Sequence, residues 1–550
     1  MENKTGATSS TKVDPKSGFN HFSRSFHSLK PPLHLPPPDV PLSAATYALF
    51  LRRNSPFPDS VTALIDSSSG LHLSYADFTH SAQTLATNLT SHLKLSKGDV
   101  ALILSPNLTN VPILCFALLS LGVVVSPANP ASTRSEITSL VDLSKPVIAF
   151  ATSATANKIP HLALGTVIID STEFDSLMTK PQPGAQLGRV EVSQSDVAVI
   201  LYSSGTTGKV KGVMLTHRNL MAMVGVYDAV VVRKEKPAVF LYTIPFFHVY
   251  GFTYNLRAMV LSDTVVIMER FSLRGMLSAV ERFKVTHLAV VPPLVVAMVK
   301  DGVTEGYDLR SLEGVACGAA PLGKDTVAAF KMKFPGVVIV QGYGLTESTA
   351  GIVRTMTPEE ASRLGTTGRL VPGVEAKIVN PNTGEAMPPG EQGELWVRGP
   401  SIMKGYAGDP EATSATLVDG WLRTGDLCYF DNEGFMYVVD RLKELIKYKG
   451  YQVAPAELEQ LLQTHPEIKD AAVIPYPDEE AGQVPMAFVV RQPQSSLGKA
   501  EILDYVAKQV APYKKIRHVA FVDSIPKNAA GKILRKDLNK IALQTSFSRL

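Results

Sequence analysis

Cysteine is scarce in this sequence of 550 residues, which contains only Cys115, Cys317 and Cys428. The three residues are scattered and odd in number, and no Cys-x-x-Cys spacing suited to a metal occurs. A disulfide framework is therefore excluded as the basis of the fold. This use of cysteine is typical of a protein that works in a reducing compartment.

Strong charge and long apolar runs are also missing. The formal net charge of +4 is too small to indicate a nucleic acid or an anionic lipid surface as a partner. The longest apolar run, Val111 to Val125, is interrupted by proline, serine and glycine. It is shorter than the roughly 18–20 residues that span a bilayer, so it predicts a buried helix followed by a strand. Residues 1–18 lack the apolar segment of a signal peptide.

The composition is that of an ordinary globular protein, with 45% hydrophobic and 19% charged residues. The length predicts two to four domains. We expect a proline-rich flexible arm over residues 1–40, a large domain over residues 41–440 and a small domain over residues 441–550. The small domain has 17 basic and 12 acidic side chains, which fits a polyanionic small ligand or a merely solvated surface.

Short β-branched runs alternate with helical patterns through the large domain. Most runs are continuously apolar, which predicts strands buried on both faces, as in an α/β sheet. Turn-rich segments near residues 380–390 then favour antiparallel hairpins, and the small domain has an α+β pattern with a helix starting at Pro455. The expected strands are Val197–Tyr202, Val265–Met268, Leu288–Val291, Val337–Val340, Gly393–Arg398, Ala471–Ile474, Met486–Val490 and His518–Val522, with a further helix at Ala500–Val510.

A loop rich in glycine and hydroxyl groups follows the first of these strands, at residues 203–211. Glycine lets backbone amides approach an anion closely, hydroxyls donate to phosphate oxygens, and lysine supplies charge. The close spacing of Gly205 and Gly208, and the lack of Ser or Thr after Lys209, exclude a Walker A loop. Composition alone fits phosphate binding and an exposed turn equally well. A helix with Thr216 as its N-cap is expected next.

The full string Ser203–Gly212 resembles the signature of the adenylate-forming superfamily, which includes acyl-CoA synthetases, luciferases and the adenylation domains of peptide synthetases. Further motifs similar to those of this family follow in the same order, at Gln341–Glu347, Trp421–Asp426, Arg441 and Pro526–Lys536. The resemblance implies an α/β plus α+β protein. Its large domain would contain two sheets packed with helices and a β-barrel-like subdomain, and its small C-terminal domain would be mobile.

The same resemblance implies that ATP and a carboxylic acid form an acyl-adenylate, whose acyl group then passes to coenzyme A. Glu347 would hold Mg²⁺, and Asp426 would accept hydrogen bonds from the ribose hydroxyls. Lys532 would be catalytic, stabilising the charge that builds between the carboxylate and the α-phosphate. The implied ATP or AMP contacts are Ser203, Ser204, Gly205, Thr206, Thr207, Lys211, Gln341, Gly342, Thr346, Asp426, Arg441 and Lys532.

The segment from Asp440 to Val453 is similar to the sequence found at this place in plant 4-coumarate:CoA ligases. This similarity implies a hinge at Lys443, about which the small domain swings between the two half-reactions. It also implies catalytic assistance from Lys447 and Gln452. The implied contacts to coenzyme A are Arg270, Lys449 and Gly450.

The segment Phe246–Gly251 resembles the one that lines the acyl pocket in this family. His248 would gate the pocket and orient the intermediate, and it stands where amino-acid-activating relatives carry an aspartate. The implied substrate contacts are Tyr250, Tyr254, Ala319, Ala320 and Gln341. Many relatives have glycine where this chain has Ala319, and the extra methyl favours a compact cinnamate-, 4-coumarate- or benzoate-type acid. A medium-chain fatty acid or a jasmonate precursor is the alternative.

The tripeptide Ser548-Arg549-Leu550 is a variant of the SKL peroxisomal targeting signal. The closest resemblance is to plant ligases that carry such signals, so we expect a peroxisomal matrix protein with the import receptor as partner. No nucleic acid partner and no membrane span are expected. Two other classes share the scaffold. A luciferase-like oxygenase would emit light or consume oxygen, and a non-catalytic binding protein would form no thioester with any acid.

Overall fold

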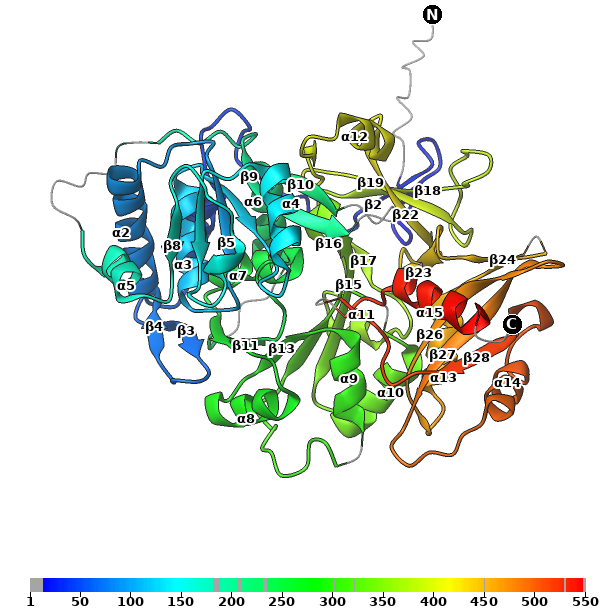
Figure 1. Cartoon of the computed structure of the whole chain (residues 1–550). Coiled ribbons are helices and arrows are strands. Elements are labelled where there is room, and N and C mark those ends of the chain that lie inside the picture. The colour runs from blue at the N-terminus through cyan, green and yellow to red at the C-terminus, as the bar shows by residue number, and fades with distance from the viewer. Residues whose placement is uncertain are drawn as a thin grey trace, which may run out of the picture.

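The computed structural model describes residues 13–181, 188, 190–204, 210–230, 235–300, 302–320, 322–449, 451–528 and 531–547. It consists of a large body containing three sheets and a small domain formed by the last part of the chain (Figure 1). No helix in the described part of the chain is long and apolar enough to cross a bilayer.

The first α/β sheet has the strand order β20-β10-β9-β6-β5-β7-β8. The run at Val111–Val125 forms a buried helix and then a strand, as predicted. The strand after the phosphate loop was not predicted: β10 returns antiparallel to β9 and pairs Lys211 with Ser203. The strands are β5 (Val100–Leu104), β6 (Val124–Pro127), β7 (Ile148–Ala151), β8 (Thr166–Ile168), β9 (Val197–Ser204), β10 (Val210–Thr216) and β20 (Gly405–Tyr406).

The second sheet has nine strands in the order β17-β16-β15-β14-β13-β11-β12-β3-β4. Its central strands β11, β13 and β14 are parallel and mostly buried, which agrees with their continuous apolar sequence. The strands are β3 (Thr62–Asp66), β4 (His72–Ser74), β11 (Val239–Tyr242), β12 (Thr264–Ile267), β13 (His287–Val290), β14 (Gly314–Cys317), β15 (Val338–Leu345), β16 (Ala350–Arg354) and β17 (Arg369–Leu370).

Helices cover these two sheets, and a continuous apolar core joins them. Helix α6 begins where predicted, because the Thr216 hydroxyl accepts a hydrogen bond from the Asn219 amide at 3.2 Å. The helices are α1 (Ala44–Arg52), α2 (Tyr75–Leu93), α3 (Asn110–Ser120), α4 (Arg134–Ser144), α5 (Thr172–Thr179), α6 (His217–Val230), α7 (Val249–Leu261), α8 (Leu273–Phe283), α9 (Pro292–Val299), α10 (Lys324–Lys333) and α11 (Pro358–Ser362), with 3₁₀ turns at Ala156–Lys158 and Thr346–Ser348.

The third sheet runs β1-β2-β18-β19-β22-β21, with β23 also paired to β22, and its described strands do not close into a barrel. Its first two strands come from the expected arm. Residues 19–27 form a hairpin that pairs with β18, and Phe26 is completely buried, so this stretch is not a free arm (Figure 1). Residues 1–12 lie outside the described residues. The elements are β1 (Phe19–Asn20), β2 (Ser25–His27), β18 (Glu375–Val379), β19 (Gly393–Arg398), α12 (Pro410–Thr416), β21 (Leu417–Val418), β22 (Trp421–Phe430) and β23 (Met436–Arg441).

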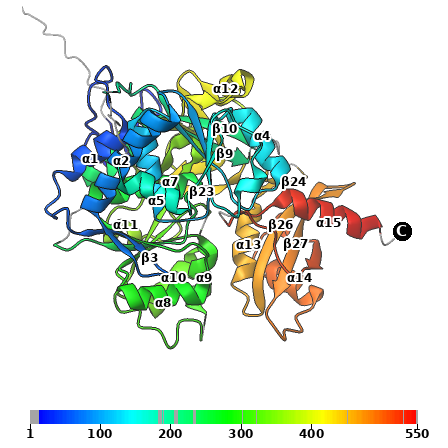
Figure 2. The same cartoon turned by 60° about the vertical axis from the view of Figure 1, so that its left-hand side comes forward.

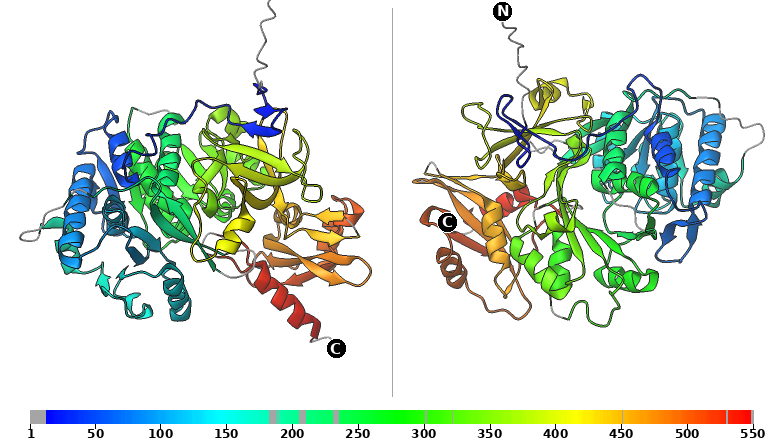
Figure 3. Two further views of the ribbon diagram at one scale, coloured as in Figure 1. Left: turned by 90° about the horizontal axis from the view of Figure 1, so that it is seen from above. Right: turned by 180° about the vertical axis from the view of Figure 1, so that it is seen from behind.

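The small domain has a five-stranded sheet, β25-β24-β27-β26, with β28 added parallel to β27. Helix α13 lies on the side facing α9 and α10, and α15 lies along the outside (Figures 2 and 3). The elements are β24 (Ile446–Tyr448), β25 (Tyr451–Val453), α13 (Pro455–Gln463), β26 (Ile468–Asp478), β27 (Gly482–Arg491), α14 (Lys499–Ala507), a 3₁₀ turn at Pro512–Lys514, β28 (His518–Phe521) and α15 (Arg535–Phe547).

Candidate active site

A cleft of about 430 Å³ lies between the large body and the small domain. One wall is formed by the ends of β14, β15, β22 and β23, and the other by α13 and the loop before α15. Among the predicted site residues, the cleft is lined by Gln341, Gly342, Ala319, Ala320, Asp426, Arg441 and Lys532. Residues separated by more than 200 positions in the sequence therefore meet at one place.

Asp426 is held at one end of this cleft by two partners. Strands β22 and β23 pair Asp426 with Arg441, whose Nε lies 3.4 Å from Oδ1 of Asp426. The hydroxyl of Tyr343 donates to Oδ2 at 2.6 Å. Burial raises the pKa of Asp426, and the charge of Arg441 opposes that rise. Tyr343 was not predicted as a site residue, although it stands inside the Gln341–Glu347 motif.

Lys532 enters the cleft from the small domain. Its loop is fixed by a backbone hydrogen bond from Asn528 to the Lys532 carbonyl at 2.9 Å, and the Asn528 side chain accepts from the Lys532 amide. Burial lowers the pKa of Lys532, the nearby Arg441 lowers it further, and Glu444 and Asp426 oppose the change. The structure therefore holds Lys532 close to the groups of the large body, as the lysine role requires.

The phosphate motif and the acidic motif meet on the other side of β15. The Ser203 hydroxyl donates to Oε1 of Glu347 at 3.1 Å, and the Tyr406 hydroxyl donates to the same oxygen at 3.1 Å. The Lys211 ammonium lies 4.4 Å from the centroid of the Tyr406 ring. Thr346 opens the 3₁₀ turn that carries Glu347. Tyr406 is a further residue that the motifs did not single out.

This corner has the chemistry that Mg²⁺ needs. One carboxylate and hydroxyl oxygens are hard donors, and Mg²⁺ in nucleotide sites is held by one or two carboxylates together with phosphate oxygens and water. The described residues contain no cluster of three or more His, Cys, Asp or Glu side chains suited to a metal. Gly205, Thr206 and Thr207 lie outside the described residues, and only the backbone of Ser204 is described.

His248 is the N-cap of α7, where its Nδ1 accepts a hydrogen bond from the Tyr250 amide at 3.3 Å. Burial lowers the pKa of His248 to about 4. The ring is therefore neutral at physiological pH, and the cap places its proton on Nε2, which is the atom left to donate.

The pH dependence of the reaction tests this state of His248. Because the folded pKa lies below the usual 6.5, protonation is disfavoured and the ring stays neutral until the pH falls towards 4. We expect the adenylation rate to show no inflection near pH 6.5 that belongs to His248. We expect His248→Ala to lower the rate about tenfold or more without changing the shape of the profile between pH 5.5 and 8. An inflection near 6.5 that vanishes in His248→Ala would contradict this result.

Tyr250 and Tyr254 stand on α7, opposite β14. The Tyr250 hydroxyl donates to the Ala316 carbonyl at 3.0 Å, and a Cβ at Gly318 would lie 3.5 Å from the Tyr250 ring. The Tyr250 and Tyr254 rings meet edge to face with centroids 4.6 Å apart. Ala319 follows with φ of 70°, a left-handed conformation that alanine adopts only at a cost. The two walls predicted for the acyl pocket are therefore in direct contact.

Replacing Ala319 by glycine should change both stability and specificity. Glycine tolerates φ of 70°, so Ala319→Gly should raise the free energy of unfolding by up to about 1 kcal/mol, observed as a higher thermal midpoint. Removing the methyl should also raise kcat/KM for longer acids relative to benzoate, because a methyl is worth roughly 1–3 kcal/mol. Ala320→Gly is the control, because it also removes a methyl from the cleft wall but Ala320 has no left-handed φ. Equal midpoints for the two variants would refute the strain argument.

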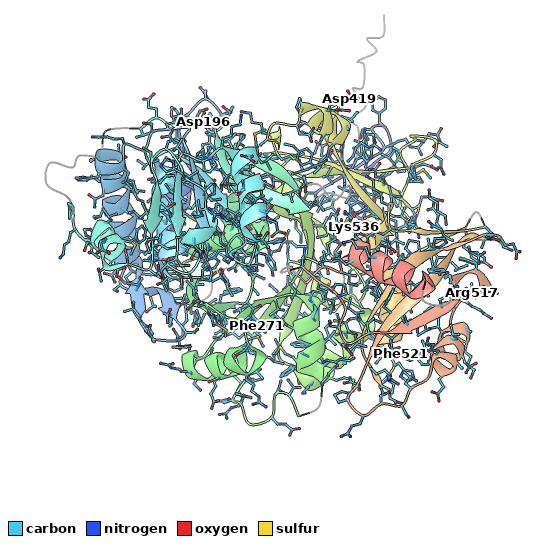
Figure 4. The ribbon with its side chains drawn as sticks, viewed as in Figure 1. Asp196, Phe271, Asp419, Arg517, Phe521 and Lys536 are labelled. Carbon is cyan, nitrogen blue, oxygen red and sulfur yellow. The ribbon has the colours of Figure 1, made fainter. Side chains whose placement is uncertain are left out.

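The cleft lining includes neither the residues expected to assist catalysis, Lys447 and Gln452, nor the expected coenzyme A contacts Lys449 and Arg270. Lys447 and Gln452 face each other across the β24–β25 hairpin and are exposed. Lys449 is paired with Glu480, and Gly450 lies outside the described residues. Arg270 is exposed on the large body, next in sequence to Phe271, which Figure 4 labels. Lys443 is exposed between β23 and β24. None of these roles is tested by this arrangement.

A buried polar network next to the predicted hinge residue Lys443 was not predicted from the sequence. Arg535 pairs with Glu444 at 2.9 Å and with Glu459 at 2.7 Å. Asp440 accepts from the Ala456 amide at 2.9 Å and so ties the last strand of the large body to the start of α13. Burial raises the pKa of Glu459 to about 7. These residues lie too far apart in the sequence for a motif to connect them.

Comparison with known proteins identifies the family. The family model for AMP-binding enzymes matches residues 50–407, and the model for the C-terminal domain of these enzymes matches residues 457–532. The chain belongs to the AMP-binding enzyme family. It is an acid:CoA ligase that works through an acyl-adenylate, and it uses ATP, Mg²⁺ and coenzyme A.

Individual relatives match over nearly their whole length. "4-coumarate--CoA ligase-like 9" of Arabidopsis thaliana is 52% identical over 99% of this chain and 100% of the relative. "Peroxisomal OPC-8:0-CoA ligase 1" of the same plant is 47% identical over 98% and 100%. The solved o-succinylbenzoate CoA synthetase of Bacillus subtilis, bound to its acyl-adenylate, aligns with a TM-score of 0.77 at 28% identity, covering 90% of this chain and 97% of the other.

Proposed function

We propose that this acid:CoA ligase activates a compact aromatic acid of the cinnamate, 4-coumarate or benzoate type. The observation that supports this choice is the narrow acyl wall, where the Tyr250 ring packs against Gly318 and is bonded to Ala316. Ala319 adds a methyl group next to this wall. Because these walls are in contact, a flat ring would require them to separate less than a long flexible chain would.

In the proposed first half-reaction, a carboxylate oxygen attacks the α-phosphorus of ATP, and the bond to the β-phosphate breaks as pyrophosphate leaves. Asp426 binds the ribose hydroxyls, with Arg441 and Tyr343 holding its carboxylate. Lys532 lies between carboxylate and phosphate, and the neutral His248 donates through Nε2. Mg²⁺ at Glu347 would neutralise charge on the departing phosphates. The protein thus acts mainly by positioning and by charge stabilisation.

In the proposed second half-reaction, the thiol of coenzyme A attacks the acyl carbon and AMP leaves. Lys449, Gly450 and Arg270 would contact coenzyme A, and Lys447 and Gln452 would assist catalysis. The absence of Lys447, Gln452, Lys449 and Arg270 from the cleft lining is consistent with rotation of the small domain about Lys443, which would withdraw Lys532 and bring the β24–β25 hairpin inward. The exposed position of Lys443, between two sheets, supports its role as hinge.

An oxylipin or medium-chain fatty acid is the second candidate substrate. It is favoured by the relative named "Peroxisomal OPC-8:0-CoA ligase 1", which is 47% identical to this chain. We also propose the peroxisomal matrix as location, with the import receptor binding Ser548-Arg549-Leu550. These three residues lie outside the described part of the chain. A fluorescent fusion that enters peroxisomes and loses import when the tripeptide is deleted would support both proposals. Failure of the intact fusion to enter peroxisomes would refute the location, and unchanged import after the deletion would refute the role of the tripeptide.

An acid panel decides between the substrates. Purified protein is incubated with ATP, Mg²⁺, coenzyme A and one acid at a time, and both pyrophosphate and thioester are measured. We expect the highest kcat/KM for cinnamate, 4-coumarate or benzoate. Higher values for medium-chain or jasmonate-precursor acids would replace the aromatic assignment with the second candidate.

A further inference from the structure

Arg354, the last residue of β16, is a partly buried cation that pairs with no acid among the described residues. Its guanidinium carbon lies 4.7 Å from the centroid of the Tyr227 ring. In the described part of the chain, no carboxylate or hydrogen-bond acceptor is paired with its side chain. Two buried arginines elsewhere in the described part of the chain are paired with acids: Arg257 with Asp263, and Arg535 with two glutamates. A partly desolvated guanidinium needs an acceptor, because its donors lose water on burial.

The register of β15 and β16 shows which face Arg354 occupies. Arg354 stands opposite Gly342, and the next residue of β15 is Tyr343. Successive side chains of a strand point to opposite faces. Tyr343 points to the nucleotide side, where it bonds Asp426. Gly342 and Arg354 therefore share the other face, where the Arg354 guanidinium meets the ring of Tyr227 from α6.

A continuous row of aromatic rings connects Arg354 to the acyl wall. The Tyr227 and Tyr254 rings are T-shaped, with centroids 6.2 Å apart, and Tyr254 contacts Tyr250 in the same way at 4.6 Å. Tyr250 is the residue that touches Gly318 and Ala316. Arg354 thus stands at the end of this row farthest from the cleft wall, where the distal part of an acyl group would lie.

The neighbours of Arg354 add positive charge instead of cancelling it. Its cross-strand partner on β17 is Arg369, and like charges placed directly opposite are destabilising. Arg369 lies over the Phe435 ring at 4.3 Å, and its buried Nε has no hydrogen-bond partner. Asp263, whose charge acts on Tyr242 and Tyr75, is already bound to Arg257. The site therefore favours a ligand that brings its own acceptor.

We propose that Arg354 donates hydrogen bonds to an oxygen on the distal part of the acyl group and so selects oxo- or hydroxy-substituted acids over the matching hydrocarbon acids. This inference rests on the proposed acyl pocket and names a substrate class within it. A phenolic, alcoholic or ketone oxygen accepts from a guanidinium, which offers five donors. A site built to hydrogen-bond a substrate rejects the analogue without that group more strongly than an apolar pocket rejects a missing methylene.

Two matched pairs of acids test the proposal: 4-coumarate against cinnamate, and 9-oxodecanoate against decanoate. For the full-length enzyme, kcat/KM is measured for each acid with ATP, Mg²⁺ and coenzyme A. We expect a preference of about tenfold or more for the oxygen-bearing member of at least one pair. Arg354→Met should bring that ratio close to one, mainly through KM, while activity on the hydrocarbon acid changes less than about threefold. Arg354→Lys should retain part of the preference.

Arg282→Met is the control, because Arg282 also stacks on an aromatic ring, Phe283, and the change removes the same charge. It should leave both ratios unchanged. Equal ratios in wild type and Arg354→Met, or an equal loss on all four acids in a folded Arg354→Met and Arg354→Lys, would overturn the role of Arg354. Absence of thioester from wild type with any carboxylic acid would instead refute the proposed function, so the two failures are distinguishable.

Discussion

Lys532→Ala should abolish acyl-adenylate formation, lowering its rate by about a thousandfold or more, while thioester formation from supplied acyl-adenylate falls less than tenfold. The structure places this ammonium in the cleft beside Asp426 and Arg441, where burial has already lowered its pKa. A positive charge held in such a site needs no reorganisation as negative charge develops in the transition state. Removing it should therefore lower the reaction rate strongly. Pyrophosphate release measures the first half-reaction, and thioester formed from synthetic adenylate measures the second.

Lys536→Ala is the matched control, since this lysine lies four residues further along the same basic segment and is exposed (Figure 4). It should leave both half-reactions near wild-type rates. Equal loss of both half-reactions in Lys532→Ala would contradict the separate role of this residue and would indicate general damage to the small domain.

Asp426→Asn should lower kcat/KM for ATP by about a hundredfold and impair both half-reactions, because the same nucleotide is bound in each. An amide keeps the shape of the side chain but removes the charge that faces Arg441, and it offers only one acceptor oxygen to the Tyr343 hydroxyl and the ribose. Removing one partner of a buried charged pair leaves the other charge uncompensated. Nucleotide affinity, measured by titration with AMP, should fall in parallel.

The control is Asp419→Asn, which makes the same chemical change at an exposed turn seven residues earlier (Figure 4). It should not change nucleotide affinity. If Asp426→Asn impaired only adenylation, Asp426 would be acting on the reacting groups and not on the ribose.

Much of the site was predictable because the motifs are contiguous. Gln341–Glu347 and Trp421–Asp426 each place several functional groups within seven residues, and local sequence also predicted strands such as Gly393–Arg398, which matches β19 without change. The apolar run that forms α3 and β6 was recognised from its nearly continuous apolar sequence. Patterns of this kind are local, so a single sequence is enough to read them.

The predictions were incomplete where distant residues meet. Composition and proline content indicated an arm over residues 1–40, but β2 adds to β18, about 350 positions away, and buries Phe26. The return strand β10 was not predicted, because its glycine and lysine residues do not indicate a strand that pairs with β9. A strand of mixed composition forms because its partner supplies hydrogen bonds, and that partner is not encoded locally.

The sequence by itself, through its motifs, identified the chemistry of an adenylate-forming ligase and predicted roles for Glu347, Asp426, Arg441 and Lys532, in this order along the chain. The tertiary structure alone decided which atoms face one another. It gave Asp426 its bond from Tyr343, brought Tyr406 to Glu347, and placed Arg354 over an aromatic ring with no acid among the described residues as its partner. The physical reason is that the residue type fixes which hydrogen bonds a side chain can donate or accept and which charge it carries. Its burial and its partners depend on the strands and helices that the whole chain packs around that side chain.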